Sequence, residues 1–105
     1  MSKVDSIARL VLGWKLNRWD RWYDREKGIF IQEQDFQPEQ NLDHAMLIVE
    51  RLQTLGYSYT VTGISKVCFN EICATGETLA KAITNAAYGL IERNYNYRAD
   101  TSGMW

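Results

Sequence analysis

The chain has 105 residues, of which 46% are hydrophobic and 24% are charged, and its formal net charge is −1. This length gives one domain with a hydrophobic core, and the composition is that of a folded protein rather than a disordered one. Proteins that bind polymeric nucleic acid carry an excess of basic residues, and 12 Lys and Arg against 13 Asp and Glu give none. We therefore expect no polymeric nucleic acid as a partner, while a local basic pocket stays compatible with this charge.

The chain has two cysteines, Cys68 and Cys73, and one histidine, His44. If both cysteines lie on one strand, their spacing turns the side chains to opposite faces, which argues against a disulfide between them. We expect two buried free thiols in a reducing cytoplasm. No residues have metal-ligand spacing, so we expect no metal and no cofactor. The short apolar run near the N-terminus is interrupted by Arg9 and predicts neither a signal peptide nor a membrane span.

The first half of the chain predicts a short helix followed by a hairpin. Apolar residues at helical spacing follow a capping Ser2 or Asp5, and Gly13 is placed to end the helix in the left-handed conformation. The next stretch, LNRWDRWYD over residues 16–24, fits a helix or a strand by period. A helix would stack like charges four residues apart, whereas the aromatic residues and the DREKG that follows favour a strand entering a hairpin. We take the hairpin, with IFIQEQ over residues 29–34 as its return strand.

The second half predicts helix, two strands and helix. Asn41 caps the clearest helix of the chain, which Gly56 ends. YSYTVTG and KVCFNEICA are two strands by their aromatic and β-branched residues. A last helix is expected to start at a capping Thr75 and to run to residue 92. The predicted fold class is therefore α+β, a three-layer α-β-α sandwich around a four-stranded, mainly antiparallel sheet in the order αββαββα. Residues 1–92 form one domain.

Three stretches resemble one protein family. IARLVLGWK is similar to the opening helix of that family, which closes on Gly-Trp. FQPEQNLDHAMLIVERLQTLGYSYTV resembles its aromatic-Pro loop, capped helix and following strand, and ATGETLAKAITNAAYGLIE resembles its closing helix. The family is the phage ABA sandwich domain, made of small α-β-α layered proteins. The resemblance implies this fold and a phage origin, hence the host cytoplasm, and it supplies no catalytic residues because the family has no assigned activity.

No catalytic signature occurs in the sequence. It holds neither a Gly-x-Ser-x-Gly nucleophile motif nor a phosphate loop with its glycines and lysine. The backbone N–H groups of Gly76 and Glu77, at the predicted start of the last helix, could meet an anion, but the charge of Glu77 opposes one. His44 is expected to face solvent or to cap its helix rather than to catalyse. We therefore expect a protein that is not an enzyme.

Aromatic and basic side chains form the candidate ligand-binding set, since aromatic rings stack on bases and arginines pair with phosphates. The set comes from the stretch around residues 18–25 and from the tail over residues 93–105. Its members are Arg18, Arg21, Trp22, Tyr23, Arg25, Arg93, Tyr95, Tyr97 and Arg98. Trp14 and Trp19 are assigned to the core instead. A polar tail normally frays, so we expect this one to dock on the domain or on a neighbouring subunit.

Two functions fit these residues. In the first, which we take as our hypothesis, the protein binds and sequesters a small anionic ligand, such as a nucleotide signal of bacterial immunity, as an anti-defence sponge. Such ligands often bind between subunits, so a homo-oligomer is expected. In the second, it is an interaction module that inhibits or modifies a host protein, with its aromatic residues as hot spots. A concave aromatic-arginine pocket would favour the first function and a flat exposed patch the second.

Overall fold

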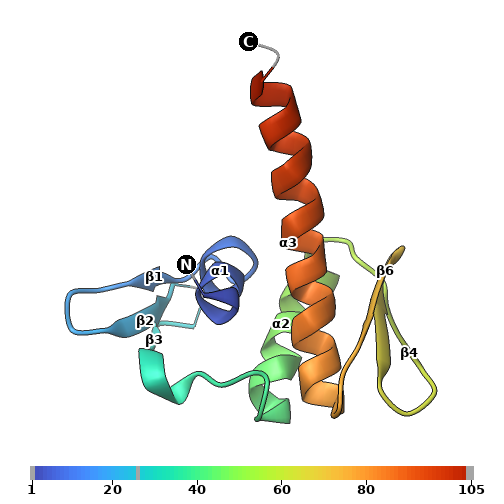
Figure 1. Cartoon of the computed structure of the whole chain (residues 1–105). Coiled ribbons are helices and arrows are strands. Elements are labelled where there is room, and N and C mark those ends of the chain that lie inside the picture. The colour runs from blue at the N-terminus through green and yellow to red at the C-terminus, as the bar shows by residue number, and fades with distance from the viewer. Residues whose placement is uncertain (1, 26, 104–105) are drawn as a thin grey trace.

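The computed structural model describes residues 2–25 and 27–103, with side chains as far as residue 93. Its elements are α1 (Lys3–Leu10), β1 (Lys15–Leu16), β2 (Arg21–Asp24), β3 (Ile29–Gln32), the short 3-10 helix η1 (Glu33–Asp35), α2 (Leu42–Thr54), β4 (Tyr59–Thr62), β5 (Lys66–Phe69), β6 (Ile72–Thr75) and α3 (Leu79–Gly103). The fold is α+β, as predicted. The strands, however, form two three-stranded antiparallel sheets, β1-β2-β3 and β4-β5-β6, rather than one four-stranded sheet. The two sheets lie on opposite sides of the helices (Figure 1).

The predicted signals at the ends of α1 are confirmed. The Oγ atom of Ser2 accepts a hydrogen bond of 3.1 Å from the backbone N–H of Asp5 and so caps the helix. After the helix, Gly13 has a φ of 73°, which glycine adopts without a steric cost. The chain reverses there, and the N–H of Trp14 donates to the carbonyl of Ala8 at 2.9 Å. The Trp14 side chain consequently returns to the core and is only 4% exposed.

The predicted first hairpin is confirmed as β2 and β3, but a turn shortens its first strand. The side chain of Asn17 accepts hydrogen bonds from the N–H groups of Trp19 and Arg21, at 2.9 and 3.1 Å. Asp20 adopts a left-handed conformation with φ 60°. Residues 17–20 are therefore a turn between β1 and β2, not part of one strand over 16–24. This turn changes which side chains of the stretch point into the protein.

A second turn divides KVCFNEICA into β5 and β6. Asn70 has a φ of 54°, and its Oδ1 atom accepts the N–H of Ser58 at 2.8 Å. The resulting register places Cys68 directly opposite Cys73 on adjacent strands, and the two form a disulfide. Our expectation of two free thiols is wrong because it assumed one strand. Across a hairpin, opposed residues face the same side of the sheet.

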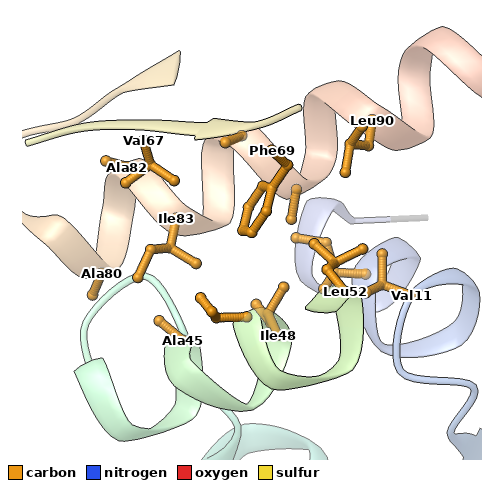
Figure 2. Packing of buried hydrophobic residues seen from close by; sticks show 14 residues of the cluster. Val11, Ala45, Ile48, Leu52, Val67, Phe69, Ala80, Ala82, Ile83 and Leu90 are labelled. Carbon is orange, nitrogen blue, oxygen red and sulfur yellow. The ribbon is translucent and has the colours of Figure 1, made fainter. Parts of the chain in front are cut away.

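The main core lies between α2, α3 and the second sheet. Figure 2 shows its side chains meeting from these elements and from α1. The apolar stripe of α2 packs against the largely alanine face of α3, and Phe69 of β5 packs beside them. The buried residues of this core are Ile7, Val11, Ala45, Ile48, Val49, Leu52, Val67, Phe69, Ala80, Ala82, Ile83, Ala86, Ala87 and Leu90. The alternating burial of β5 follows the period of two expected for a half-buried strand.

The last helix begins at Leu79, three residues after Gly76, because β6 extends to Thr75. Thr78, rather than Thr75, caps it: its Oγ1 atom accepts the N–H of Lys81 at 3.2 Å. Gly76 lies so close to this first turn that an added Cβ would be 2.6 Å from the nitrogen of Ala82. Only glycine fits at this approach of loop to helix.

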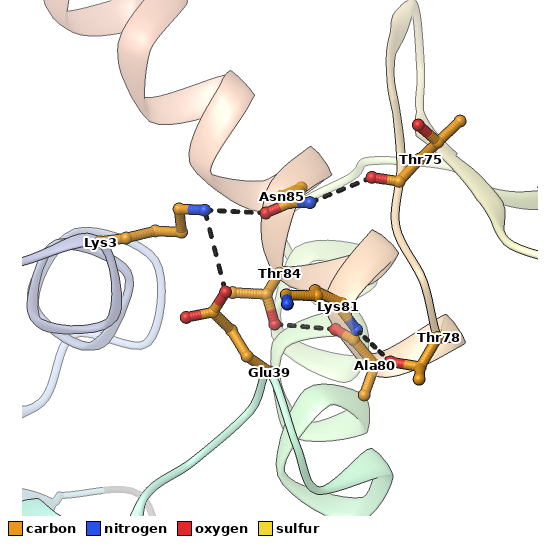
Figure 3. A network of polar contacts seen from close by, with 8 residues as sticks. All are labelled: Lys3, Glu39, Thr75, Thr78, Ala80, Lys81, Thr84 and Asn85. Atoms are coloured by element: carbon orange, nitrogen blue, oxygen red, sulfur yellow. Dashed lines mark hydrogen bonds and ion pairs between the residues drawn. The ribbon is translucent and has the colours of Figure 1, made fainter.

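Polar side chains join α1, the loop before α2, and α3 (Figure 3). The Nζ atom of Lys3 donates to Asn85 of α3 at 2.9 Å and lies 3.9 Å from the carboxylate of Glu39. Asn85 in turn donates to the carbonyl of Thr75 at 3.0 Å. These contacts tie the start of the chain to α3 and β6.

Residues 93–103 belong to α3, where the sequence predicted an irregular tail. Figure 1 shows the C-terminal part of this helix extending beyond the other elements. That the segment docks on a neighbouring subunit remains a prediction.

Candidate functional site

The inner face of the first sheet covers a second, smaller core. Trp22 lies at its centre with no exposed surface, and Ala8, Trp14 and Phe36 pack around it. The rings of Trp14 and Phe36 meet edge to face, with centroids 4.9 Å apart. The guanidinium of Arg9 lies 5.2 Å from the centroid of the Trp22 ring. The assignment of Trp22 to ligand binding is therefore not supported, because its side chain is enclosed.

The outer face of the same sheet is open and aromatic. Tyr23 of β2 is paired with Phe30 of β3, and their ring centroids are 4.9 Å apart. Phe30 is 56% exposed although phenylalanine is normally buried. Arg21 lies two residues from Tyr23 on the same face and is exposed.

The turn between β1 and β2 adds further exposed aromatic and basic side chains beside this sheet. Trp19, which we assigned to the core, is 67% exposed, because the turn at residues 17–20 breaks the strand on which that assignment depended. The guanidinium of Arg18 lies 4.9 Å from the centroid of the Trp19 ring, a cation–π contact. We call the resulting surface the aromatic-basic face; its residues are Arg18, Trp19, Arg21, Tyr23 and Phe30.

A hollow of different character lies between the β2–β3 hairpin and α2. It consists of two adjoining cavities of about 110 and 270 Å³, which share Leu12, Asp24 and Arg51 in their walls. Among the described residues, four basic side chains from separate parts of the chain line these cavities, together with two carboxylates. We call this hollow the cationic cleft; its charged residues are Lys15, Asp24, Arg25, Lys27, Glu50 and Arg51.

Hydrogen bonds fix the inner wall of the cationic cleft. The Nε atom of Arg51 donates to the carbonyl of Val11 at 3.3 Å. Asp24 is 8% exposed, and its Oδ1 atom accepts the backbone N–H of Lys27 at 3.3 Å. The Nζ atom of Lys27 lies 4.0 Å from the carboxylate of Glu50, with both side chains largely exposed.

A third hollow, of about 430 Å³, lies beside the N-terminus of α1. Its charged lining residues are all acidic: Asp5, Glu33 and Glu39. These carboxylates repel an anion, whereas the charged residues of the cationic cleft are mostly basic.

Two other candidates from the sequence have structural roles. The Nδ1 atom of His44 accepts the backbone N–H of Gln37 at 3.1 Å, so His44 holds the loop before α2. The N–H of Gly76 donates to the carbonyl of Ser65 at 3.3 Å and is not offered to an anion. Since β6 and a short connection precede α3, residues 76–77 are not the first turn of this helix, and the anion site that the charge of Glu77 already opposed does not form.

The predicted site residues fall in different places. Arg18, Arg21 and Tyr23 lie on the aromatic-basic face, whereas Arg25 lines the cationic cleft. Arg93 pairs with Glu71 of the β5–β6 turn at 3.8 Å, on the other side of the helices. The side chains of the remaining three members lie outside the described residues: Tyr95, Tyr97 and Arg98.

Sequence reasoning missed two residues of the aromatic-basic face, Trp19 and Phe30, and three basic residues of the cleft, Lys15, Lys27 and Arg51. The alternation in IFIQ could have indicated that Phe30 and Tyr23 share a face of the hairpin. No local signal could have identified Arg51, because it is distant in sequence from residues 24–27 and only folding brings it beside them.

The model of the phage ABA sandwich domain matches residues 5–88. The chain belongs to this family. The suspected resemblance is thereby confirmed, and the match includes both the aromatic-basic face and the cationic cleft but ends before Arg93. No curated protein and no solved structure matches the chain.

Two negative findings concern the described residues alone. Nowhere in residues 2–25 and 27–103 do three His, Cys, Asp or Glu side chains gather so that they could hold a metal ion. None of the helices in this same part of the chain combines the length and the apolar character that crossing a membrane requires.

Proposed function

We propose that this phage-family protein acts by binding rather than by catalysis, and that its aromatic-basic face docks an acidic surface of a host protein. One observation carries the proposal: Trp19 in the β1–β2 turn and Phe30 on the outer side of the first sheet are 67% and 56% exposed, and Arg18 lies over the Trp19 ring. None of its residues lines any of the three hollows described above, which favours a macromolecular partner over a small ligand.

The residue types are those that dominate protein interfaces. Trp, Tyr and Arg are enriched among hot spots, where removal of one side chain costs at least about 2 kcal/mol of binding free energy. Leaving a tryptophan in water forgoes the stabilisation that its burial would give, so Trp19 contributes little to folding here. Arg18 and Arg21 give the face a positive charge, against which the turn supplies one acidic residue, Asp20. The complementary partner surface is therefore acidic.

The experiment is quantitative affinity capture from phage-infected cells with three tagged proteins. The test variant is Trp19→Ala/Phe30→Ala, and the matched control is Ile64→Ala, which removes a side chain that is 96% exposed in the β4–β5 connection. The wild type and the control should retain the same host protein. The test variant should bind it with a Kd about thirtyfold higher or more, which corresponds to a loss of about 2 kcal/mol of binding free energy. Equal retention by all three would refute the proposal.

Sequestration of a small anionic ligand is a second candidate function, which the cationic cleft favours. Four basic side chains around one hollow suit the phosphates of a nucleotide-type immune signal. In this proposal the site is the cleft, and among the predicted site residues whose side chains the structure describes, Arg25 alone lines it. Native mass spectrometry with cyclic oligonucleotides and ADP-ribose derivatives tests both the ligand and the expected homo-oligomer. A bound ligand that heat releases unchanged would support a sponge, and no adduct across the panel would count against it.

A further inference from the structure

We infer that the cationic cleft is a binding site for a phosphate-type oxyanion. The inference deepens the second candidate function by naming the chemical group that the cleft recognises, and it does not depend on the proposed docking of a host protein. The cleft and the aromatic-basic face share no residue, so substitutions can address one without the other.

The charges of the cleft favour an anion. Among the described lining residues, Lys15, Arg25, Lys27 and Arg51 contribute four positive charges, and Asp24 and Glu50 contribute two negative ones. A hollow with walls of low dielectric constant concentrates the field of such charges. The hollow beside the N-terminus of α1 differs, since its described charged lining residues, Asp5, Glu33 and Glu39, are all acidic.

The basic groups differ in how firmly they are held. Arg51 is oriented by the hydrogen bond from its Nε atom to Val11, and its Nη2 atom lies 3.8 Å from the position that a Cβ would take on Gly13. The exposed pair of Lys27 and Glu50, at 4.0 Å, is screened by water, so such a contact is readily exchanged for one to an anion. Arg25 is exposed at the edge of the hollow and can turn toward a bound group.

The size and lining of the cleft select a small oxyanion over a nucleobase. The two cavities, of about 110 and 270 Å³, admit a phosphate group more readily than a whole nucleotide. Trp14 is the only aromatic residue among those lining them, and it is 4% exposed and held edge to face by Phe36. No ring is therefore available to stack on a base. Arginine and lysine donors are suited to phosphate oxygens.

The test is a titration of the ¹⁵N-labelled protein with inorganic phosphate at constant ionic strength, followed by backbone amide shifts at Gly13 and Gly28. Saturable shifts are expected for the wild type. The double variant Arg25→Gln/Lys27→Gln should raise the Kd about tenfold or more, since each lost charge-assisted contact weakens binding. Arg18→Gln/Arg21→Gln removes the same charge from the aromatic-basic face and should leave the Kd unchanged. No saturable shift, or an equal loss in both variants, would overturn the inference.

A parallel titration with adenosine monophosphate distinguishes the source of the group. An equal Kd would assign the cleft to the free oxyanion, and a lower Kd would assign it to a phosphomonoester; both require the cationic cleft. The outcome is separable from the sponge proposal. A nucleotide adduct in native mass spectra that Arg25→Gln/Lys27→Gln leaves unchanged would support sequestration and refute the cleft as its site.

Discussion

Trp22 and Trp19 provide a direct test of the fold, since they are three residues apart and have opposite environments. Trp22→Ala empties the centre of the second core, where the side chain has no exposed surface. Removal of a fully buried tryptophan costs about 3–5 kcal/mol. At about 4 °C or more per kcal/mol, Tm should fall by at least about 12 °C. Trp19→Ala makes the same chemical change at a side chain that is 67% exposed, and it should cost no more than about 1 kcal/mol, mostly the contact with Arg18.

Urea unfolding followed by far-ultraviolet circular dichroism is the appropriate assay, because tryptophan fluorescence changes with the substitutions themselves. A third variant refines the argument. The Nε1 atom of Trp22 is buried without a hydrogen-bond partner in the structure. Trp22→Phe removes this unsatisfied donor and keeps an aromatic ring, so it should cost about 1–2 kcal/mol, clearly less than Trp22→Ala. If Trp19→Ala unfolds at a lower urea concentration than Trp22→Ala, the assignment of inner and outer faces is wrong.

Three further predictions concern the second sheet. Gly76→Ala should lower the free energy of unfolding by about 3 kcal/mol, because the added Cβ would clash with the backbone of α3. Gly63→Ala is the comparison: its Cβ would meet open space, but the φ of 67° is strained for alanine and should cost about 1 kcal/mol in the same urea assay. The double variant Cys68→Ser/Cys73→Ser should lower the free energy of unfolding by about 2 kcal/mol, because the disulfide closes only a short loop. The intact mass before and after reduction verifies the disulfide in the wild type. Burial raises the pKa of Tyr59; the folded state therefore holds this proton more tightly than the unfolded state, and stability is lost as pH rises above about 10. Tyr59→Phe should show a smaller fall in Tm between about pH 9 and pH 11, and an equal fall would contradict this cause.

The sequence determined the elements whose signals are local. The cap at Asn41 and the apolar stripe after it predicted α2, and the structure confirms both, with the Oδ1 atom of Asn41 accepting the N–H of His44 at 3.2 Å. The positive φ angles at Gly13 and Gly28 were likewise indicated by residue type, because glycine is the residue that most readily adopts them. Helix caps and tight turns depend on a few neighbouring residues, so a single sequence is sufficient to predict them.

Only the tertiary structure decided which face of each strand is buried and which residues distant in sequence come into contact. The turns at Asp20 and Asn70 use left-handed non-glycine residues, which carry a weak sequence signal, and each turn changes the alternation of the side chains around it. The exchange of roles between Trp19 and Trp22 follows from the first of these turns, and the pairing of the two cysteines from the second. The cationic cleft has the same origin. Its described basic groups come from β1, from the turn between β2 and β3, and from α2, and only packing brings them to one hollow. No periodicity in the sequence records contacts between such distant segments.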